Sequence, residues 1–283
     1  MKVYSDVCYG KLGLDAQKLD LYIPDCESFK TFVYFHGGGL KDGDKASATM
    51  QKLGEHLAEH GIACASVNYR MYPNTKYPEF ICDCAESVAW VKENIEKYGR
   101  SEGIFVGGSS AGGYLSMMLC FDKRWLGEYG ILPTDISGYV HDAGQPTAHF
   151  TVLNYSGIDP KRVIVDDTAP LYHIGCDEKY SPMLFIVSDN DMQNRYEQTM
   201  LVISTLKHFG HEGDEVELRV MNGRHCQYIG EMANEKNNMI FAEMTAEFIK
   251  KTVGRRSFFL LFTNEHLSPI VAVGIVANAD LCK

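Results

Sequence analysis

Short apolar runs alternate along the chain with longer segments in which apolar residues recur every three or four positions. Short runs of this kind are typical of strands buried on both faces of a sheet, and the longer segments are typical of helices that cover it. This alternation of strand and helix predicts parallel pairing through right-handed crossovers. The predicted strands are 30–35, 62–67, 103–106, 138–140 and 182–188, and the predicted helices are 47–60, 80–98, 114–119, 198–209 and 234–249.

Two segments differ from this buried pattern. Residues 17–23 alternate polar and apolar and stop at Pro24, which predicts a half-exposed antiparallel strand near one edge of the sheet. Residues 2–9 are its expected hairpin partner. Residues 215–220 also alternate, as an edge strand does. The whole pattern predicts an α/β fold with a mostly parallel central sheet and helices on both faces.

The length and composition fit one large domain. The chain has 283 residues, of which 45% are hydrophobic, as in a protein with a sizeable core. We expect a single α/β domain over residues 1–253, with cap-like loops around 141–180. Residues 254–283 form an extension of unknown role. Its apolar runs are too short to span a bilayer. Three interpretations of this segment fit the sequence: an added edge strand, a dimer contact and an artificial extension.

The charge, the N-terminal sequence and the cysteine content indicate which partners the protein binds and where it is located. The formal net charge of -10 argues against nucleic acid or an anionic membrane as a main partner, because both attract basic surfaces. The N-terminus shows no apolar segment of the secretory kind, which predicts a cytoplasmic protein. The 9 cysteines have no paired metal-type spacing, so we interpret them as free thiols and expect no bound metal.

Candidate chemistry concentrates in the glycine-rich stretch 107–113. It follows an apolar run and precedes a helical one, and residues 108–112 fit the pattern Gly-x-Ser-x-Gly. In that pattern the central serine sits on a strained turn between strand and helix and presents its hydroxyl as a nucleophile. Ser110 is therefore the candidate, because Ser109 would lack the second glycine. Taken alone, the stretch also fits a plain loop or a phosphate-binding nest.

A second glycine run covers residues 36–39 (His-Gly-Gly-Gly) and follows the first predicted buried strand. Glycines can turn their backbone amides toward a ligand without steric cost, and each amide placed in advance for an oxyanion contributes about 3 to 4 kcal/mol. We assign the amides of Gly38, Gly39 and Ala111 to an oxyanion hole. His36 is interpreted as a brace for the loop rather than as a base.

Four features then occur in a fixed order: the His-Gly-Gly-Gly run, a Tyr-Arg-x-Tyr-Pro loop at 69–73, a long helix and the Gly-x-Ser-x-Gly turn. In this order they resemble the α/β-hydrolase esterases related to hormone-sensitive lipase. The likeness is greater still to the small bacterial branch that includes acetyl, feruloyl and other carbohydrate esterases, with kynurenine formamidase as a neighbour. It covers about residues 17–251. Leu40 departs from it, since many members of the small branch have tryptophan there.

The resemblance implies two further members of a catalytic triad, an acid and then a histidine, each after a later strand. The strand at 182–188 is followed by Asp189 and Asp191, and the register usual in the family selects Asp191 as the acid. Asp177, in the preceding loop, is a weaker third candidate. His225 lies in a short glycine-containing loop after the last predicted strand and is the implied base.

The segment 141–150 follows the predicted strand 138–140 and is rich in polar and turn-forming residues. At the carboxyl end of a parallel strand it would lie at the mouth of a pocket, where α/β folds bind ligands. Gln145, Thr147 and His149 are therefore candidate substrate contacts, and a purely structural loop is the alternative.

Together these residues predict a cofactor-free serine carboxylic ester hydrolase of the α/β-hydrolase fold, working through Ser110, Asp191 and His225 by way of an acyl-enzyme. Its expected substrates are small acyl or feruloyl-type, carbohydrate-linked esters, as the resemblance implies. One alternative is an amidase of the kynurenine-formamidase kind. Another is a non-catalytic small-molecule-binding protein on the same scaffold, like the plant gibberellin receptors. The oligomeric state is open, and a homodimer is compatible with the sequence.

Overall fold

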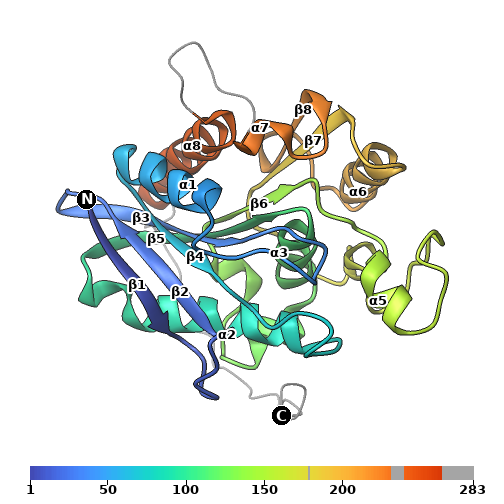
Figure 1. Cartoon of the computed structure of the whole chain (residues 1–283). Helices are drawn as coiled ribbons and strands as arrows, with labels where there is room; N and C mark the ends of the chain where they lie inside the picture. Colours follow the sequence, from blue (N-terminus) through green and yellow to red (C-terminus); the bar gives the residue numbers. More distant parts are fainter. Residues whose placement is uncertain (178, 231–238, 263–283) are drawn as a thin grey trace.

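The computed structural model describes residues 1–177, 179–230 and 239–262. Within them one sheet has the strand order β1-β2-β4-β3-β5-β6-β7-β8 (Figure 1). Its pairs from β4 across to β8 are parallel, and β2 is antiparallel to both β1 and β4. The predicted mostly parallel sheet is therefore confirmed. The strands are β1 Lys2–Cys8, β2 Lys18–Ile23, β3 Ser28–Phe35, β4 Ile62–Val67, β5 Arg100–Ser109, β6 Gly138–Asp142, β7 Met183–Asn190 and β8 Val216–Arg224.

Strand β2 corrects one expectation about the sheet. It is antiparallel and near one edge as predicted, but its side chains beyond Lys18 are buried rather than alternately exposed. Its polar residue Asp20 can be buried because the Nζ of Lys45 lies 2.6 Å from its carboxylate. The predicted hairpin partner, β1, takes the exposed edge, and β8 takes the other edge as predicted.

Two apolar cores lie on opposite faces of the sheet. Alternate residues of β3 contribute to them, Val33 and Phe35 to one core and Phe32 and Tyr34 to the other, because successive side chains of a strand point to opposite faces. The helices on the first core are α2 (Glu79–Asn94), α3 (Ala111–Phe121) and α6 (Arg195–His208), and those on the second are α1 (Ala48–Glu59) and α8 (Ile240–Phe262) (Figure 1). Helices on both faces are thus confirmed.

The helix boundaries shift from the predicted ones for local reasons. Helix α1 begins after Ser47, whose hydroxyl accepts the amide of Met50 at 3.4 Å and so caps the helix. Helix α2 ends at Asn94, and residues 95–97 tighten into a 3-10 turn. Three short helices complete the described set: α4 (Lys123–Gly127), α5 (Phe150–Tyr155) and α7 (Gln227–Gly230).

The predicted domain boundary at 253 falls inside α8, which runs on to Phe262. Residues 254–262 therefore continue a helix and do not form an edge strand. The remainder of the expected extension, 263–283, lies outside the described residues, as do 234–238 of the predicted last helix. Among the helices described, none combines the length and the apolar character needed to cross a bilayer.

Among the described residues, the cysteines follow the predicted free-thiol state with one exception. Cys64, Cys84 and Cys120 are free and buried, so they serve as small core residues. Burial raises the pKa of each of these thiols, which keeps them protonated. Cys82 is disulfide-bonded, so the prediction of free thiols is wrong for this residue.

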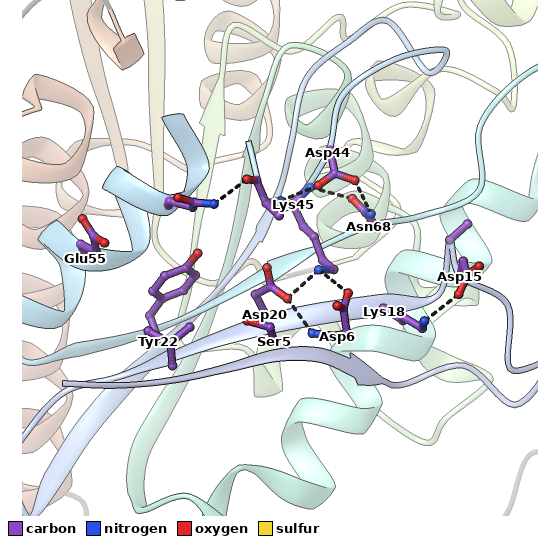
Figure 2. A pocket seen from close by; sticks show the side chains of 14 residues that line it. Ser5, Asp6, Asp15, Lys18, Asp20, Tyr22, Asp44, Lys45, Glu55 and Asn68 are labelled. Carbon is purple, nitrogen blue, oxygen red and sulfur yellow. Dashed lines mark hydrogen bonds and ion pairs between the residues drawn. The ribbon is translucent and has the colours of Figure 1, made fainter. Parts of the chain in front are cut away.

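A hollow of about 690 Å³ lies between the N-terminal strands and the start of α1 (Figure 2). Lys45 reaches into it, and its Nζ pairs with Asp6 of β1 at 2.9 Å and with Asp20 of β2 at 2.6 Å. The amide of Lys45 donates to the side chain of Asn68, just after β4, at 2.7 Å. These contacts tie the hairpin to the loop before α1. None of the predicted site residues lines this hollow.

Candidate active site

The candidate nucleophile, Ser110, stands on the turn between β5 and α3. Its backbone has φ 56° and ψ -112°, a combination that side chains rarely adopt and that is typical of functional turns. Its amide donates to the carbonyl oxygen of Asp142 at 2.8 Å, which fixes the turn to the end of β6. The turn therefore holds the Ser110 hydroxyl beyond the carboxyl end of β5.

The two glycines of the serine motif are required by close packing. A β-carbon on Gly112 would lie 1.9 Å from the carbonyl oxygen of Phe35, and one on Gly108 would lie 2.6 Å from the same oxygen. Both contacts are with backbone, which cannot yield as the end of a flexible side chain can. The crossing of β3, β5 and α3 thus explains the Gly-x-Ser-x-Gly pattern sterically.

The structure brings Ser110, His225 and Asp191 together in one row. The Oγ of Ser110 lies 2.9 Å from Nε2 of His225, and Nδ1 of His225 lies 2.5 Å from Oδ1 of Asp191. With its Nδ1 proton directed at the carboxylate, His225 keeps Nε2 free to accept the serine proton. The side chain of Asp191 is fully buried and that of His225 is 22% exposed, so the imidazole is open to a ligand while the acid is shielded.

Asp191 is held in its charged form. Burial acts to raise its pKa, but the hydrogen bond and charge of His225, with the amides of Met192 and Ser188, outweigh burial and hold the pKa of Asp191 below its ordinary value. The Met192 amide donates to Oδ1 at 2.7 Å and the Ser188 amide to Oδ2 at 3.2 Å. The carboxylate therefore suits a partner that must stabilise a histidine cation.

The two alternative acids contact other groups. Asp189 is exposed, and its Oδ1 accepts the amide of Gly223 at 2.9 Å, which links the ends of β7 and β8. Asp177 forms an ion pair with a lysine of α4 at 2.8 Å. Within the described part of the chain neither carboxylate is hydrogen-bonded to His225, so the geometry favours Asp191 as the partner.

The glycine loop after β3 lies directly beside the nucleophile. A β-carbon on Gly37 would lie 3.3 Å from that of Ser110, so the two backbones are close neighbours. Gly38 has φ 112° and Gly39 has φ 63°, conformations that favour glycine. Among the described residues, the amides of Gly38, Gly39 and Ala111 donate to no protein acceptor. Unpaired amides next to a serine hydroxyl fit an oxyanion hole.

Two side chains brace this loop. The hydroxyl of Thr151 donates to the carbonyl oxygen of Gly39 at 2.6 Å. The imidazole of His36 stacks on Tyr69 with ring centroids 4.6 Å apart, and its Nδ1 lies 2.7 Å from the carbonyl oxygen of Gly37. Burial lowers the pKa of His36, which keeps the ring neutral. These contacts agree with its interpretation as a brace.

The three predicted substrate contacts differ in their surroundings. Gln145 lines a hollow of about 370 Å³ beside the site, and its amide nitrogen donates to the carbonyl oxygen of Ala148 at 2.8 Å. Thr147 and His149 are each only 1% exposed. Nδ1 of His149 accepts the amide of Thr151 at 3.2 Å and caps α5. Thr147 and His149 thus support the loop from inside, and Gln145 borders open space.

A buried acid beneath the serine turn was missed in the sequence. Asp142, the last residue of β6, has no exposed surface and accepts a hydrogen bond from the hydroxyl of Tyr228. Burial, only partly offset by hydrogen bonds from Ser109 and Tyr228, raises the pKa of Asp142 to about 7. Ser109 in turn accepts the hydroxyl of Tyr34 at 2.8 Å. The available signal was a lone aspartate at the end of an apolar strand, which does not by itself reveal these partners.

The arrangement supplies the groups that acyl transfer needs: a hydroxyl in contact with a base, an acid that orients the base, and backbone donors beside the hydroxyl. Metal chemistry finds no comparable support. In residues 1–177, 179–230 and 239–262, no group of three or more His, Cys, Asp or Glu side chains is placed to hold a metal ion.

Sequence comparison finds a family model and named esterases that match part of the chain. Residues 19–150, a little under half of the chain, match the BD-FAE family model. The probable carboxylic ester hydrolase LipM of Mycobacterium tuberculosis is 38% identical over 118 residues, which are 40% of this chain and 27% of LipM. A probable isoprenylcysteine alpha-carbonyl methylesterase of Arabidopsis thaliana is 33% identical over 125 residues, 43% of this chain and 29% of that protein. The chain thus covers less than a third of the length of these two relatives.

Solved structures match over about nine tenths of the chain. Esterase B from Lactobacillus rhamnosis has a TM-score of 0.73 at 17% identity, covering 92% of this chain and 88% of its own. A truncated carbohydrate esterase from gut microbiota has a TM-score of 0.71 at 18% identity, covering 89% of this chain and 97% of its own. These matches confirm the predicted α/β-hydrolase fold. With the sequence matches, they confirm the predicted resemblance to the esterases of this fold.

Proposed function

We propose that the chain is a serine carboxylic ester hydrolase that works through an acyl-enzyme. One observation carries the proposal: the Ser110 hydroxyl lies 2.9 Å from Nε2 of His225, whose other ring nitrogen is held by Asp191. The matched family segment, residues 19–150, contains both the glycine loop and Ser110, which supports the same reading of the site.

In the proposed reaction, Nε2 of His225 takes the proton of Ser110 as the serine oxygen attacks the ester carbonyl carbon. The amides of Gly38, Gly39 and Ala111 receive the oxyanion that forms. The tetrahedral intermediate then expels the alcohol, which takes its proton from His225, and the acyl group stays on Ser110. Water repeats the sequence: it gives a proton to His225, attacks the acyl carbon, and releases the acid while the proton returns to the serine oxygen.

The proposed substrates are small acyl or feruloyl-type esters, including esters linked to carbohydrate. Support comes from the BD-FAE match and from the fold likeness to a carbohydrate esterase from gut microbiota. The same groups would cleave an activated amide, so turnover of 4-nitrophenyl acetate, methyl ferulate and N-formylkynurenine should be compared. We expect the two esters to be the better substrates, and faster turnover of N-formylkynurenine would favour the amidase instead.

A fluorophosphonate probe tests the nucleophile directly, because it phosphonylates a serine that an adjacent base has activated. Intact-mass spectrometry should show one added phosphonyl group on the wild type and on Ser109→Ala, the matched control next to it. Ser110→Ala should remain unlabelled. A folded wild type that takes up no label, or a Ser110→Ala variant that is labelled as fast as the wild type, would contradict the proposal.

A further inference from the structure

The hollow of about 370 Å³ beside the candidate active site lies between α5, the loop 160–163 and the start of α6. Two of its lining residues connect it to the site. The ring of Phe150 would lie 3.4 Å from a β-carbon on Gly39, and Met192 directly follows Asp191. The hollow therefore lies next to the glycine loop on one side and to the residue after Asp191 on the other.

The lining of this hollow is cationic in a protein that is acidic overall. Of the residues that the structure describes, Lys161, Arg162 and Arg195 line it and no Asp or Glu does, although the chain carries a formal net charge of -10. Lys161 and Arg162 are exposed at its rim, and within the described residues neither side chain forms an ion pair. The nearby carboxylate of Asp159 accepts the backbone amide of Lys161 at 3.0 Å and does not line the hollow.

Arg195 is a buried cation whose hydrogen bonds go to neutral groups. Its side chain lies inside the protein, the residue being only 4% exposed. Its guanidinium donates to the carbonyl oxygen of Ala143 at 2.6 Å and to Oε1 of Gln145 at 3.4 Å. Among the described residues no carboxylate forms an ion pair with it. Burial lowers the pKa of Arg195 to about 10, against the opposing charge of Asp191.

A buried cation without a counter-ion costs free energy, and an anion placed beside it recovers part of that cost. The guanidinium has five N–H donors in one plane, a geometry that matches a carboxylate. Its two described hydrogen bonds leave donors for a ligand in the hollow that Arg195 lines. Lys161 and Arg162 at the rim would attract an anionic ligand from solution.

We propose that this hollow binds a carboxylate carried by the substrate, so that the preferred ester has a free carboxylate in its acyl or its alcohol part. The inference rests on the proposed esterase function. The hollow contains one buried positive charge, that of Arg195, while the other two cations stay in solvent. A carboxylate, with a single negative charge, therefore suits the hollow better than a phosphate dianion.

Two matched ester pairs test the proposal. 4-Nitrophenyl hydrogen glutarate and its methyl ester place the charge on the acyl side, and 4-acetoxybenzoate and its methyl ester place it on the alcohol side. In at least one pair the wild type should favour the charged member by at least about tenfold in kcat/KM, as a charge-assisted hydrogen bond supplies. That preference should disappear in Arg195→Gln. Lys207→Gln, which removes an exposed charge from the far end of the same helix, should keep the wild-type preference.

Binding without turnover separates this inference from the esterase function. Calorimetric titration of benzoate into Ser110→Ala should show binding that the double variant Ser110→Ala, Arg195→Gln lacks, even if no ester is hydrolysed by the wild type. If Arg195→Gln does not fold, a second variant replaces both exposed cations, Lys161→Gln with Arg162→Gln. It should bind benzoate several-fold more weakly than the parent protein at low salt.

Three results would overturn the proposal: no preference in either ester pair by an active wild type, equal benzoate binding with and without the Arg195 guanidinium, or tighter binding of inorganic phosphate than of benzoate. Loss of all ester turnover together with Arg195-dependent benzoate binding would instead reject the esterase function and keep the carboxylate site.

Discussion

The hydroxyl of Tyr228 donates a hydrogen bond to Oδ1 of Asp142, and both side chains are buried below the turn that carries Ser110. Burial raises the pKa of Asp142 from 3.8 to about 7. The folded protein therefore holds a proton that the unfolded chain releases between about pH 4 and pH 7. Because the native state binds more protons in this window, its stability falls as the pH rises through it.

Asp142→Asn removes this titration. Between pH 4 and pH 8, ionisation of the Asp142 carboxyl should lower the free energy of unfolding of the wild type by up to about 4 kcal/mol. The free energy of unfolding of the variant should lack this part of the pH dependence. Urea unfolding at several pH values measures both slopes. Asp191, whose pKa is lowered, acts in the opposite sense and mostly below about pH 5, so it affects only the acidic end of this window. Equal slopes in variant and wild type would show that Asp142 ionises as freely as in the unfolded chain.

Replacement of the two acids near the end of β7 should have very different effects on turnover. Asp191→Asn leaves His225 without the carboxylate that orients its ring, and the equivalent change in a known triad lowers kcat about 10000-fold. Asp189→Asn alters only an exposed turn contact to Gly223, so kcat should stay within about threefold of the wild type. Steady-state hydrolysis of 4-nitrophenyl acetate by both purified variants provides the comparison. Similar losses in both would remove the distinction between the two aspartates.

The rate should depend on pH through His225. Once protonated, His225 cannot take the proton of Ser110, so kcat/KM should fall toward acidic pH. The pKa of Asp191 is held below its ordinary value, so this carboxylate stays charged over the range and does not cause the fall. Burial raises the pKa of Asp142 to about 7, and Asp142→Asn is therefore the control. The acidic limb should persist in that variant, and its loss there would assign the limb to Asp142 rather than to His225.

Gly112→Ala should destabilise the fold. Its β-carbon would meet the carbonyl oxygen of Phe35 at 1.9 Å, and overpacking of this kind costs at least about 2 kcal/mol, more than the roughly 1 kcal/mol that alanine contributes to a helix. Gly127→Ala is the matched control, because a β-carbon at Gly127 of α4 meets nothing within 4 Å. Urea midpoints should move in opposite directions in the two variants. A Gly112→Ala protein as stable as the wild type would mean that β3 and α3 can separate there.

Much of the fold follows from local patterns in the sequence. The apolar runs at 30–35 and 62–67 locate strands well, because a strand covered on both faces needs side chains that are apolar throughout. The serine turn is equally local, since Gly108 and Gly112 are fixed by contacts with β3. The pairing of His225 with Asp191 follows from chain order, because both residues come just after neighbouring parallel strands.

Other features depend on contacts between distant segments and have no local signal. Strand β2 alternates in sequence but is buried, because Lys45 neutralises Asp20 from a loop 25 positions away. Arg195 looks like an ordinary charged residue at the start of a helix, and only the fold places it against Ala143 and Gln145. Burial of a charged side chain depends on what the rest of the chain brings to it, so periodicity does not predict it.

Phe150 borders the cationic hollow and lies beside Gly39, and the hydroxyl of the next residue, Thr151, donates to the carbonyl oxygen of Gly39. The hollow proposed to select the substrate and the glycine loop proposed to hold the oxyanion are thus both bordered by the same residue, Phe150. An attempt to broaden the range of accepted esters by replacing Phe150 with a smaller residue should therefore also loosen the backbone amides proposed to receive the oxyanion. Val163 and Gln198 also line the hollow, and within the described residues neither forms a hydrogen bond with the glycine loop, so enlargement at these two positions should leave catalytic speed intact.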